Sequence, residues 1–318
     1  MVPAFGLFEL GLHVWQVQRA LTAEDWDRAV ASGPWRKSMR HPSGVLKSGD
    51  GVAVTPEWAS PMLRRALGTH ATLNQFAESD YSHLSRVWEF SLDGSSVLPT
   101  SWGEDTLVAG HGRIALRLRL NPHPEPMITD LLARASSGTD EALSVSRGTL
   151  GAETPCAWHE GAPRIDADQE AWGLARGAHY VQCADKTKMS VQIVPDHNWR
   201  PRRCFSVPTA GPSARTRLVF HKVQFARFVR MHDGLHAYEE DPQNAQANIK
   251  LSVSVRGLAE DGKMAELKLG ENTHHNGEAW KAFDVDTSAV PTGEVGDLIL
   301  DVESDAADHK FCLEGSTR

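Results

Sequence analysis

The chain has 318 residues, of which 41% are hydrophobic and 23% charged, a composition typical of globular proteins and too apolar for a disordered one. Its 33 basic and 41 acidic residues give a net charge of −8, which argues against a general nucleic-acid binder, because neutralising phosphates requires a surplus of Lys and Arg. No run of about 18 apolar residues occurs, so the sequence predicts no membrane-spanning helix.

Residues 1–80 are predicted to be mainly helix and loop. Thr22 is placed to cap a short helix, and Trp26 and Val30 lie on one apolar face of it. Thr55-Pro56 is a second start signal, with proline at the first helical position.

The middle of the chain favours strands. Apolar and polar residues alternate over 86–92 and over 114–120, the pattern of half-buried strands. We expect a short helix over 127–135, a loop over the Ser-, Gly- and Thr-rich residues 136–155, and one or two strands over 181–194. Residues 1–200 therefore form a mixed α/β region in this interpretation.

Residues 195–214 contain four prolines and are the best candidate for a linker. Beyond it, the alternation of Leu251, Val253 and Val255, and of Leu298, Leu300 and Val302, predicts buried strands of an antiparallel β-sandwich over 215–318. The predicted fold class is α+β: a mixed helix/strand N-terminal region followed by a jelly-roll-like sandwich.

A stretch near the end of the chain has a familiar pattern. Residues 280–286 (WKAFDVD) precede a turn at Gly293, then the strand of residues 298–302, then a final strand that ends near Arg318. This order resembles the closing half of galactose-binding-like jelly rolls, the architecture of many carbohydrate-binding modules. The resemblance covers 215–318 at most. It implies a sandwich that binds sugar or calcium, and it assigns no residue a role.

The four cysteines, Cys156, Cys183, Cys204 and Cys312, are far apart, and none forms a CxxC pair. The N-terminus also lacks the basic leading segment of a signal peptide. We therefore expect four unpaired thiols and a cytoplasmic protein.

Histidines beside carboxylates suggest a catalytic site near the linker. His197 is assigned as general base or metal ligand, with Asp196 or Glu160 as its orienting carboxylate, His159 as a second base or ligand, and Arg200 as an anion clamp. The hypothesis requires the 156–160 and 196–200 loops to meet at the boundary between the two regions.

Two weaker patterns concern a divalent metal, zinc or calcium. His232 and His236 have a spacing that zinc sites use on helices, although the glutamate of the HExxH motif is absent. Asp284, Asp286 and Asp305 belong to an acidic stretch that could supply oxygen ligands to calcium. For these pairs and acids, a solvated loop or face is the competing interpretation.

Three functions remain open. The first is an enzyme, most plausibly a hydrolase or lyase that uses histidine and carboxylate acid–base or metal chemistry. The second is a protein whose sandwich binds a carbohydrate or another small ligand. The third is a structural component of an assembly, which would make the chain an oligomer. Fold alone does not decide among them.

Overall fold

A computed structural model describes residues 46–56, 60, 63, 73–92, 94–103, 106–111, 114–161, 178–196, 200–236, 247–258 and 264–318. The chain divides into two compact units, Met1–Pro124 and Glu125–Arg318. Most of the helix predicted for residues 1–80 lies outside the described residues. Within them, no helix is long and apolar enough to cross a membrane.

The first unit contains one four-stranded sheet, in the order β1-β2-β4-β3. Its elements are β1 (Gly51–Thr55), α5 (Leu73–Phe76), β2 (Arg86–Ser91), β3 (Thr106–His111) and β4 (Ile114–Leu120). Strand β1 runs parallel to β2, and the other neighbours are antiparallel. The strands predicted over 86–92 and 114–120 are confirmed as β2 and β4.

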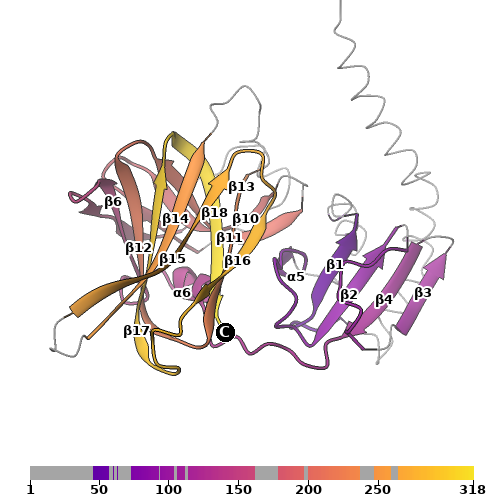
Figure 1. Ribbon diagram of the computed structural model, residues 1–318. Coiled ribbons are helices and arrows are strands. Elements are labelled where there is room, and N and C mark those ends of the chain that lie inside the picture. Colours follow the sequence, from indigo (N-terminus) through magenta and orange to yellow (C-terminus); the bar gives the residue numbers. More distant parts are fainter. Residues whose placement is uncertain are drawn as a thin grey trace, which may run out of the picture. The chain divides into compact units, whose positions relative to one another are not determined.

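The second unit is a sandwich of two antiparallel sheets (Figure 1). The eight-stranded sheet has the order β16-β13-β18-β11-β10-β9-β8, with β5 beside β18, and the six-stranded sheet has the order β15-β14-β17-β12-β6-β7. The elements are β5 (Thr129–Asp130), α6 (Leu131–Ser136), β6 (Leu143–Thr149), β7 (Thr154–Pro155), β8 (Ala157–Glu160), β9 (His179–Gln182), β10 (Lys188–Pro195), β11 (Pro201–Ala210), β12 (Ala214–Gln224), β13 (Phe228–Leu235), β14 (Asn248–Leu258), β15 (Met264–His275), β16 (Lys281–Asp286), β17 (Val295–Ser304) and β18 (Ala307–Thr317).

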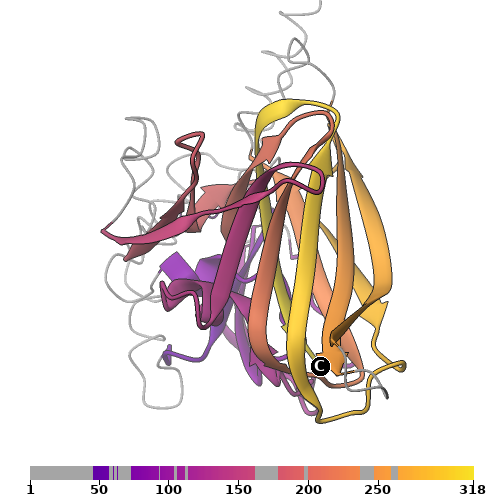
Figure 2. The same cartoon turned by 90° about the vertical axis from the view of Figure 1, so that its left-hand side faces the viewer.

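The core of the sandwich is built from inward-facing side chains of its strands. Figure 2 shows the strands of this unit from the side. The six residues whose alternation predicted two buried strands, Leu251, Val253, Val255, Leu298, Leu300 and Val302, are all buried. Phe205 of β11 and Phe311 of β18 join the same core from the other sheet. Residues 215–318 lie in the antiparallel sandwich, and the compact unit that contains it begins at Glu125.

The predicted α+β class is wrong, because the described residues are nearly all β, with only short helices such as α5 and α6. Composition favoured loops where the alternation of buried and solvated residues forms strands. Residues 136–155 were predicted as a loop for their Ser, Gly and Thr content, yet Leu143 and Val145 point inward and are buried, and β6 pairs with β12. A strand with one solvated face tolerates serine at every outward position.

The segment predicted as a linker, 195–214, instead contains β11, which lies between β10 and β18 in the eight-stranded sheet. Its prolines occupy places where a ladder hydrogen bond is dispensable. Pro201 is opposite Pro195 at the end of the β10–β11 pairing, and Pro208 adjoins a shift in the register with β18. The two compact units meet in sequence after Pro124.

The prediction of four unpaired thiols is also wrong. Cys156 is bonded to Cys183, and Cys204 is bonded to Cys312. The pairing follows from sheet register, because β8 pairs with β9 directly beside the first bond and β11 pairs with β18 across the second. Sequence distance concealed both pairs. The expectation of a cytoplasmic protein, which used the thiols as evidence, loses that support.

Candidate functional site

Asp196 and Arg200, two members of the predicted catalytic group, close the hairpin between β10 and β11. Asp196 Oδ1 accepts a hydrogen bond from the Arg200 backbone N–H at 3.0 Å, and Oδ2 accepts one from Arg202 Nε at 2.6 Å. All three side chains are buried. The carboxylate therefore fastens a turn and an arginine of the adjoining strand.

His159 and Glu160 lie on β8, where both are exposed. The His159 ring stacks on that of Tyr180, with 5.1 Å between the ring centroids. Across the sheet, Trp158 of β8 is level with Val181 of β9 and Met189 of β10. His159, one residue further along β8, is therefore about six residues short of the level of Asp196. Since strands advance about 3.3 Å per residue, His159 and Asp196 are about 20 Å apart along the sheet, and the structure does not bring them together. His197 lies outside the described residues, and its role stays a prediction.

His232 and His236 lie on or next to strand β13 instead of a helix. His232 Nδ1 is 3.1 Å from Glu314 Oε1, and His236 Nε2 is 3.6 Å from Cys312 Sγ. Each imidazole is held by its own partner on β18. Burial, together with the charge of Lys310, lowers the pKa of His236 to about 3, so this ring is neutral at pH 7.

The acids proposed as calcium ligands are each bound to a different partner. Asp284 is paired with Arg230, Asp286 with Ser288, and Asp305 bonds the backbone and side chain of Asn248. Across the part of the chain that the structure describes, no group of three or more His, Cys, Asp or Glu residues is arranged to hold a metal ion. The metal hypothesis therefore gains no support.

An open depression lies where β13 begins and β16 ends, and it is a candidate for a ligand site. It has a volume of about 870 Å³. Its lining comes from β13 and the two residues before it, from the end of β16 and the loop that follows, and from Glu125 ahead of β5. It consists of Glu125, Ala226, Arg227, Phe228, Arg230, Asp284, Asp286, Thr287, Ser288, Val290, Pro291 and Thr292. A site of this size with one aromatic ring and several polar groups matches the general form of ligand sites.

Arg230 organises the charged side of the depression. Its guanidinium donates two hydrogen bonds to Asp284, from Nε at 2.8 Å and from Nη2 at 2.9 Å, and a third from Nη1 to Glu125 Oε2 at 2.7 Å. It also lies over the Phe228 ring, 5.1 Å from the centroid. Arg318 Nη1 donates to the same oxygen of Glu125 at 3.2 Å. These contacts hold the arginine and the ring in one fixed arrangement.

Hydroxyl groups also line the depression. Asp286, at the end of β16, accepts hydrogen bonds from the backbone N–H and the Oγ of Ser288, at 2.8 and 2.9 Å. These bonds, the backbone one first, hold the pKa of Asp286 below its ordinary value, so the exposed carboxylate stays ionised. Thr287 Oγ1 donates to the Ala226 backbone carbonyl at 2.6 Å and anchors the loop to the end of the sheet.

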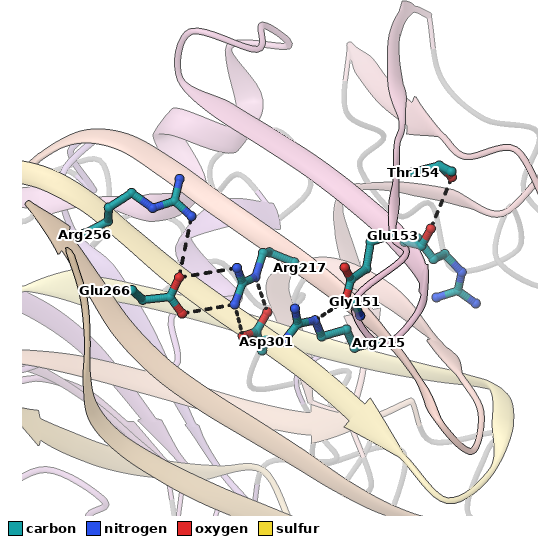
Figure 3. A network of polar contacts seen from close by, with 9 residues as sticks. Gly151, Glu153, Thr154, Arg215, Arg217, Arg256, Glu266 and Asp301 are labelled. Atoms are coloured by element: carbon teal, nitrogen blue, oxygen red, sulfur yellow. Dashed lines mark hydrogen bonds and ion pairs between the residues drawn. The ribbon is translucent and has the colours of Figure 1, made fainter. Parts of the chain in front are cut away.

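A second polar surface crosses the outer face of the six-stranded sheet. Figure 3 shows Arg217 between Asp301 and Glu266, with hydrogen bonds of 2.7–3.3 Å to both carboxylates. Arg215 bonds Glu153 and approaches Asp301, so cation and anion alternate across the strands. The hydrogen bonds that Arg217 donates to Asp301, with the carboxylate charges, raise the pKa of Arg217 above its usual value. Because these charged groups are already paired with one another, we interpret this arginine–carboxylate network as structural: it links neighbouring strands of the sheet.

No protein-family model matches the chain, and no curated protein is significantly similar to it. Similar solved structures exist. A carbohydrate-binding module specific for non-crystalline cellulose is 10% identical, with 50% of this chain and 96% of that chain covered and a TM-score of 0.31. The family 11 carbohydrate-binding module of Clostridium thermocellum, solved with a mixed-linked tetrasaccharide, is 10% identical, with 55% and 96% covered and a TM-score of 0.27.

A third similar structure, the CBM22-1–GH10 part of xylanase 10B from Clostridium thermocellum with xylohexaose, is 11% identical at a TM-score of 0.28. The match covers 60% of this chain and 28% of that one. At these TM-scores the comparisons carry no argument about a ligand. The sandwich architecture rests on the strand pairing, and the site on its own geometry.

The sequence did not reveal the depression, because Phe228 and Arg230 lie in a stretch with the pattern of an ordinary strand. The available signal was an aromatic residue and an arginine two positions apart, since residues at that spacing share one face of a strand. That pattern is common, and only the register of β16 shows that Asp284 lies opposite Arg230.

Proposed function

We propose that this protein binds carbohydrate through the depression where β13 begins and β16 ends. One observation supports the proposal above others: an aromatic ring, an immobilised guanidinium, an ionised carboxylate and several hydroxyls line one open concavity. A sugar ring presents an apolar C–H face and a periphery of hydroxyls, each of which both donates and accepts. Phe228 matches the first feature, and Arg230, Asp286 and Thr292 match the second.

The disulfides agree with this proposal. Disulfide bonds persist in oxidising compartments, where a protein that binds extracellular polysaccharide would meet its ligand. We therefore propose an oxidising compartment in place of the cytoplasm.

The test is saccharide binding by isothermal titration calorimetry, with xylohexaose, a mixed-linked β-glucan tetrasaccharide and N-acetylglucosamine as probes. We expect one of them to bind, with Phe228→Ala raising Kd at least about tenfold, equivalent to about 1.4 kcal/mol. Asp286→Asn, an exposed substitution that leaves the core intact, should also weaken binding.

Lys268→Ala is the matched control, because Lys268 is exposed on β15 and does not line the depression. Binding that neither Phe228→Ala nor Asp286→Asn weakens would refute the depression as the site. Failure of all three saccharides to bind would refute carbohydrate recognition itself.

A further inference from the structure

Three side chains on adjacent strands form a continuous hydrogen-bonded chain on the outer face of the six-stranded sheet. Ser144 Oγ on β6 is 2.9 Å from His221 Nε2 on β12, and His221 Nδ1 is 3.0 Å from Asp297 Oδ1 on β17. The His221 and Asp297 side chains are 28% and 21% exposed, and Ser144 is half-buried. The order is serine, histidine, aspartate, with the histidine in the middle.

The local fold explains why these side chains meet. Leu143 and Val145 point into the core, so Ser144 between them points outward. Phe220 and Val223 of β12 are both buried, with two residues between them where a regular strand has one. His221 is one of the two, so β12 bulges at this point, and bulges re-aim side chains near functional sites.

The backbone of the bulge is unusual, because Lys222 takes a positive φ of 52°. Two hydrogen bonds stabilise it. Arg134 of helix α6 donates hydrogen bonds to the backbone carbonyls of His221, at 2.6 Å, and Lys222, at 2.5 Å. The irregular backbone of β12 is therefore fixed by a cation from another element, and the His221 ring is held between its two partners.

We propose that Ser144, His221 and Asp297 form a catalytic triad that hydrolyses esters. The carboxylate of Asp297 accepts the Nδ1–H of His221, which leaves Nε2 without a proton and able to accept the Ser144 O–H. Nucleophile–base and base–carboxylate distances near 3 Å are those that activate serine in enzymes of unrelated folds. Such a triad is recognised by geometry and role, whatever the order of its members in the chain.

The reaction balances with water as the second substrate. Ser144 Oγ attacks the ester carbonyl carbon, and its proton passes to His221 Nε2. The C–O bond to the alcohol breaks, and His221 gives that proton to the leaving oxygen, so an acyl-serine remains. A water molecule then attacks the acyl carbon, His221 takes its proton and returns one to Ser144 Oγ, and the carboxylic acid leaves.

The competing interpretation is a hydrogen-bonded network that only fastens three strands, as the arginine–carboxylate network does nearby. The two differ in the reactivity of Ser144, because a fastening serine has no enhanced nucleophilicity. A fluorophosphonate probe reports this directly: incubation with the intact protein, digestion and mass spectrometry should find the phosphonyl group on Ser144. This readout needs no variant to fold.

The activity assay uses p-nitrophenyl acetate, whose good leaving group makes a small demand on transition-state stabilisation. We expect hydrolysis by the intact protein to fall at least about a hundredfold in Ser144→Ala and His221→Gln, and strongly in Asp297→Asn, which spoils the tautomer of the histidine. Ser146→Ala is the matched control, because Ser146 is a half-buried serine two residues along the same face of β6. An unlabelled Ser144, or a Ser144→Ala protein that hydrolyses the ester at the original rate, would overturn the proposal.

Discussion

The two sheets of the sandwich present very different outer faces. On the six-stranded sheet many outward side chains are charged or hydroxylic and half-exposed, as Arg217 and Ser144 illustrate. On the eight-stranded sheet the edge strands β8 and β16 also carry exposed residues, such as His159 and Asp284. Around the central strands β10, β11 and β18, polar groups are buried: the Cys204–Cys312 disulfide is fully inaccessible, Asp196 is 2% exposed and His236 is 1% exposed. The outer face of the six-stranded sheet is therefore wet, whereas the eight-stranded sheet has a buried region around β10, β11 and β18, called the dry face below.

The difference shows where polar groups are costly. On the wet face, water competes for every charge, so an ion pair contributes little and can be rearranged. On the dry face, each polar atom depends on its protein partner, so losing that partner leaves a desolvated group. Reactive or exchangeable groups are therefore expected on the wet face, and structural fastenings on the dry one.

The largest expected effect comes from the disulfide of the dry face. The Cys204–Cys312 bond closes a loop of 108 residues, and the Cys156–Cys183 bond one of 27. Loop entropy then predicts losses of unfolding free energy of about 5 kcal/mol for Cys204→Ala/Cys312→Ala and about 3.5 kcal/mol for Cys156→Ala/Cys183→Ala. Urea unfolding of the two double variants measures this order.

Two observations would contradict that prediction. One is a reversed order of the two losses. The other is a reactive thiol in the unfolded, unreduced protein, since both bonds together leave none of the four cysteines free.

The next effect compares one carboxylate from each face. Asp196→Asn removes the charge that holds Arg202 on the dry face, and we expect a loss of about 3 kcal/mol, typical of a broken buried pair. Glu266→Gln, on the wet face, removes a partner of Arg217 that is 33% exposed, and should cost less than about 1 kcal/mol. Chemical unfolding of both variants tests this, and equal losses would show that the two faces do not differ in this way.

Residue alternation predicted the inward side of the six-stranded sheet well. Leu251 and Leu300 are buried as expected, because their strands are amphipathic and register is fixed by the core. Prolines and serines misled the interpretation at β11 and β6, since bulges and solvated faces accommodate both residue types.

The outward side could not be predicted in the same way. Cys204 and Cys312 are 108 positions apart, and only the β11–β18 register shows that they lie on neighbouring strands. The same holds for Ser144, His221 and Asp297, which come from three strands and one bulge. Adjacent residues such as His159-Glu160 suggested a shared site, although neighbours on a strand point to opposite faces of the sheet.

The last prediction concerns the pH dependence of the dry face. Burial lowers the pKa of His236 to about 3 in the folded protein, whereas an unfolded histidine titrates near about 6.5. Between these values the unfolded chain binds a proton that the folded chain does not, so acidification favours unfolding. The free energy of unfolding should therefore fall by up to about 1.4 kcal/mol per pH unit as the pH drops through this window. Below about pH 3, the contribution of His236 to this pH dependence should level off. In His236→Gln this contribution disappears. The free energy of unfolding, measured with urea at pH 4, 5 and 6, should therefore change less steeply with pH than in the unmodified protein. Calorimetric unfolding in buffers of different ionisation enthalpy should find one proton fewer taken up by the variant. Equal slopes and equal proton uptake in the two proteins would show that His236 titrates alike in the folded and unfolded chains, and that its burial has no energetic consequence.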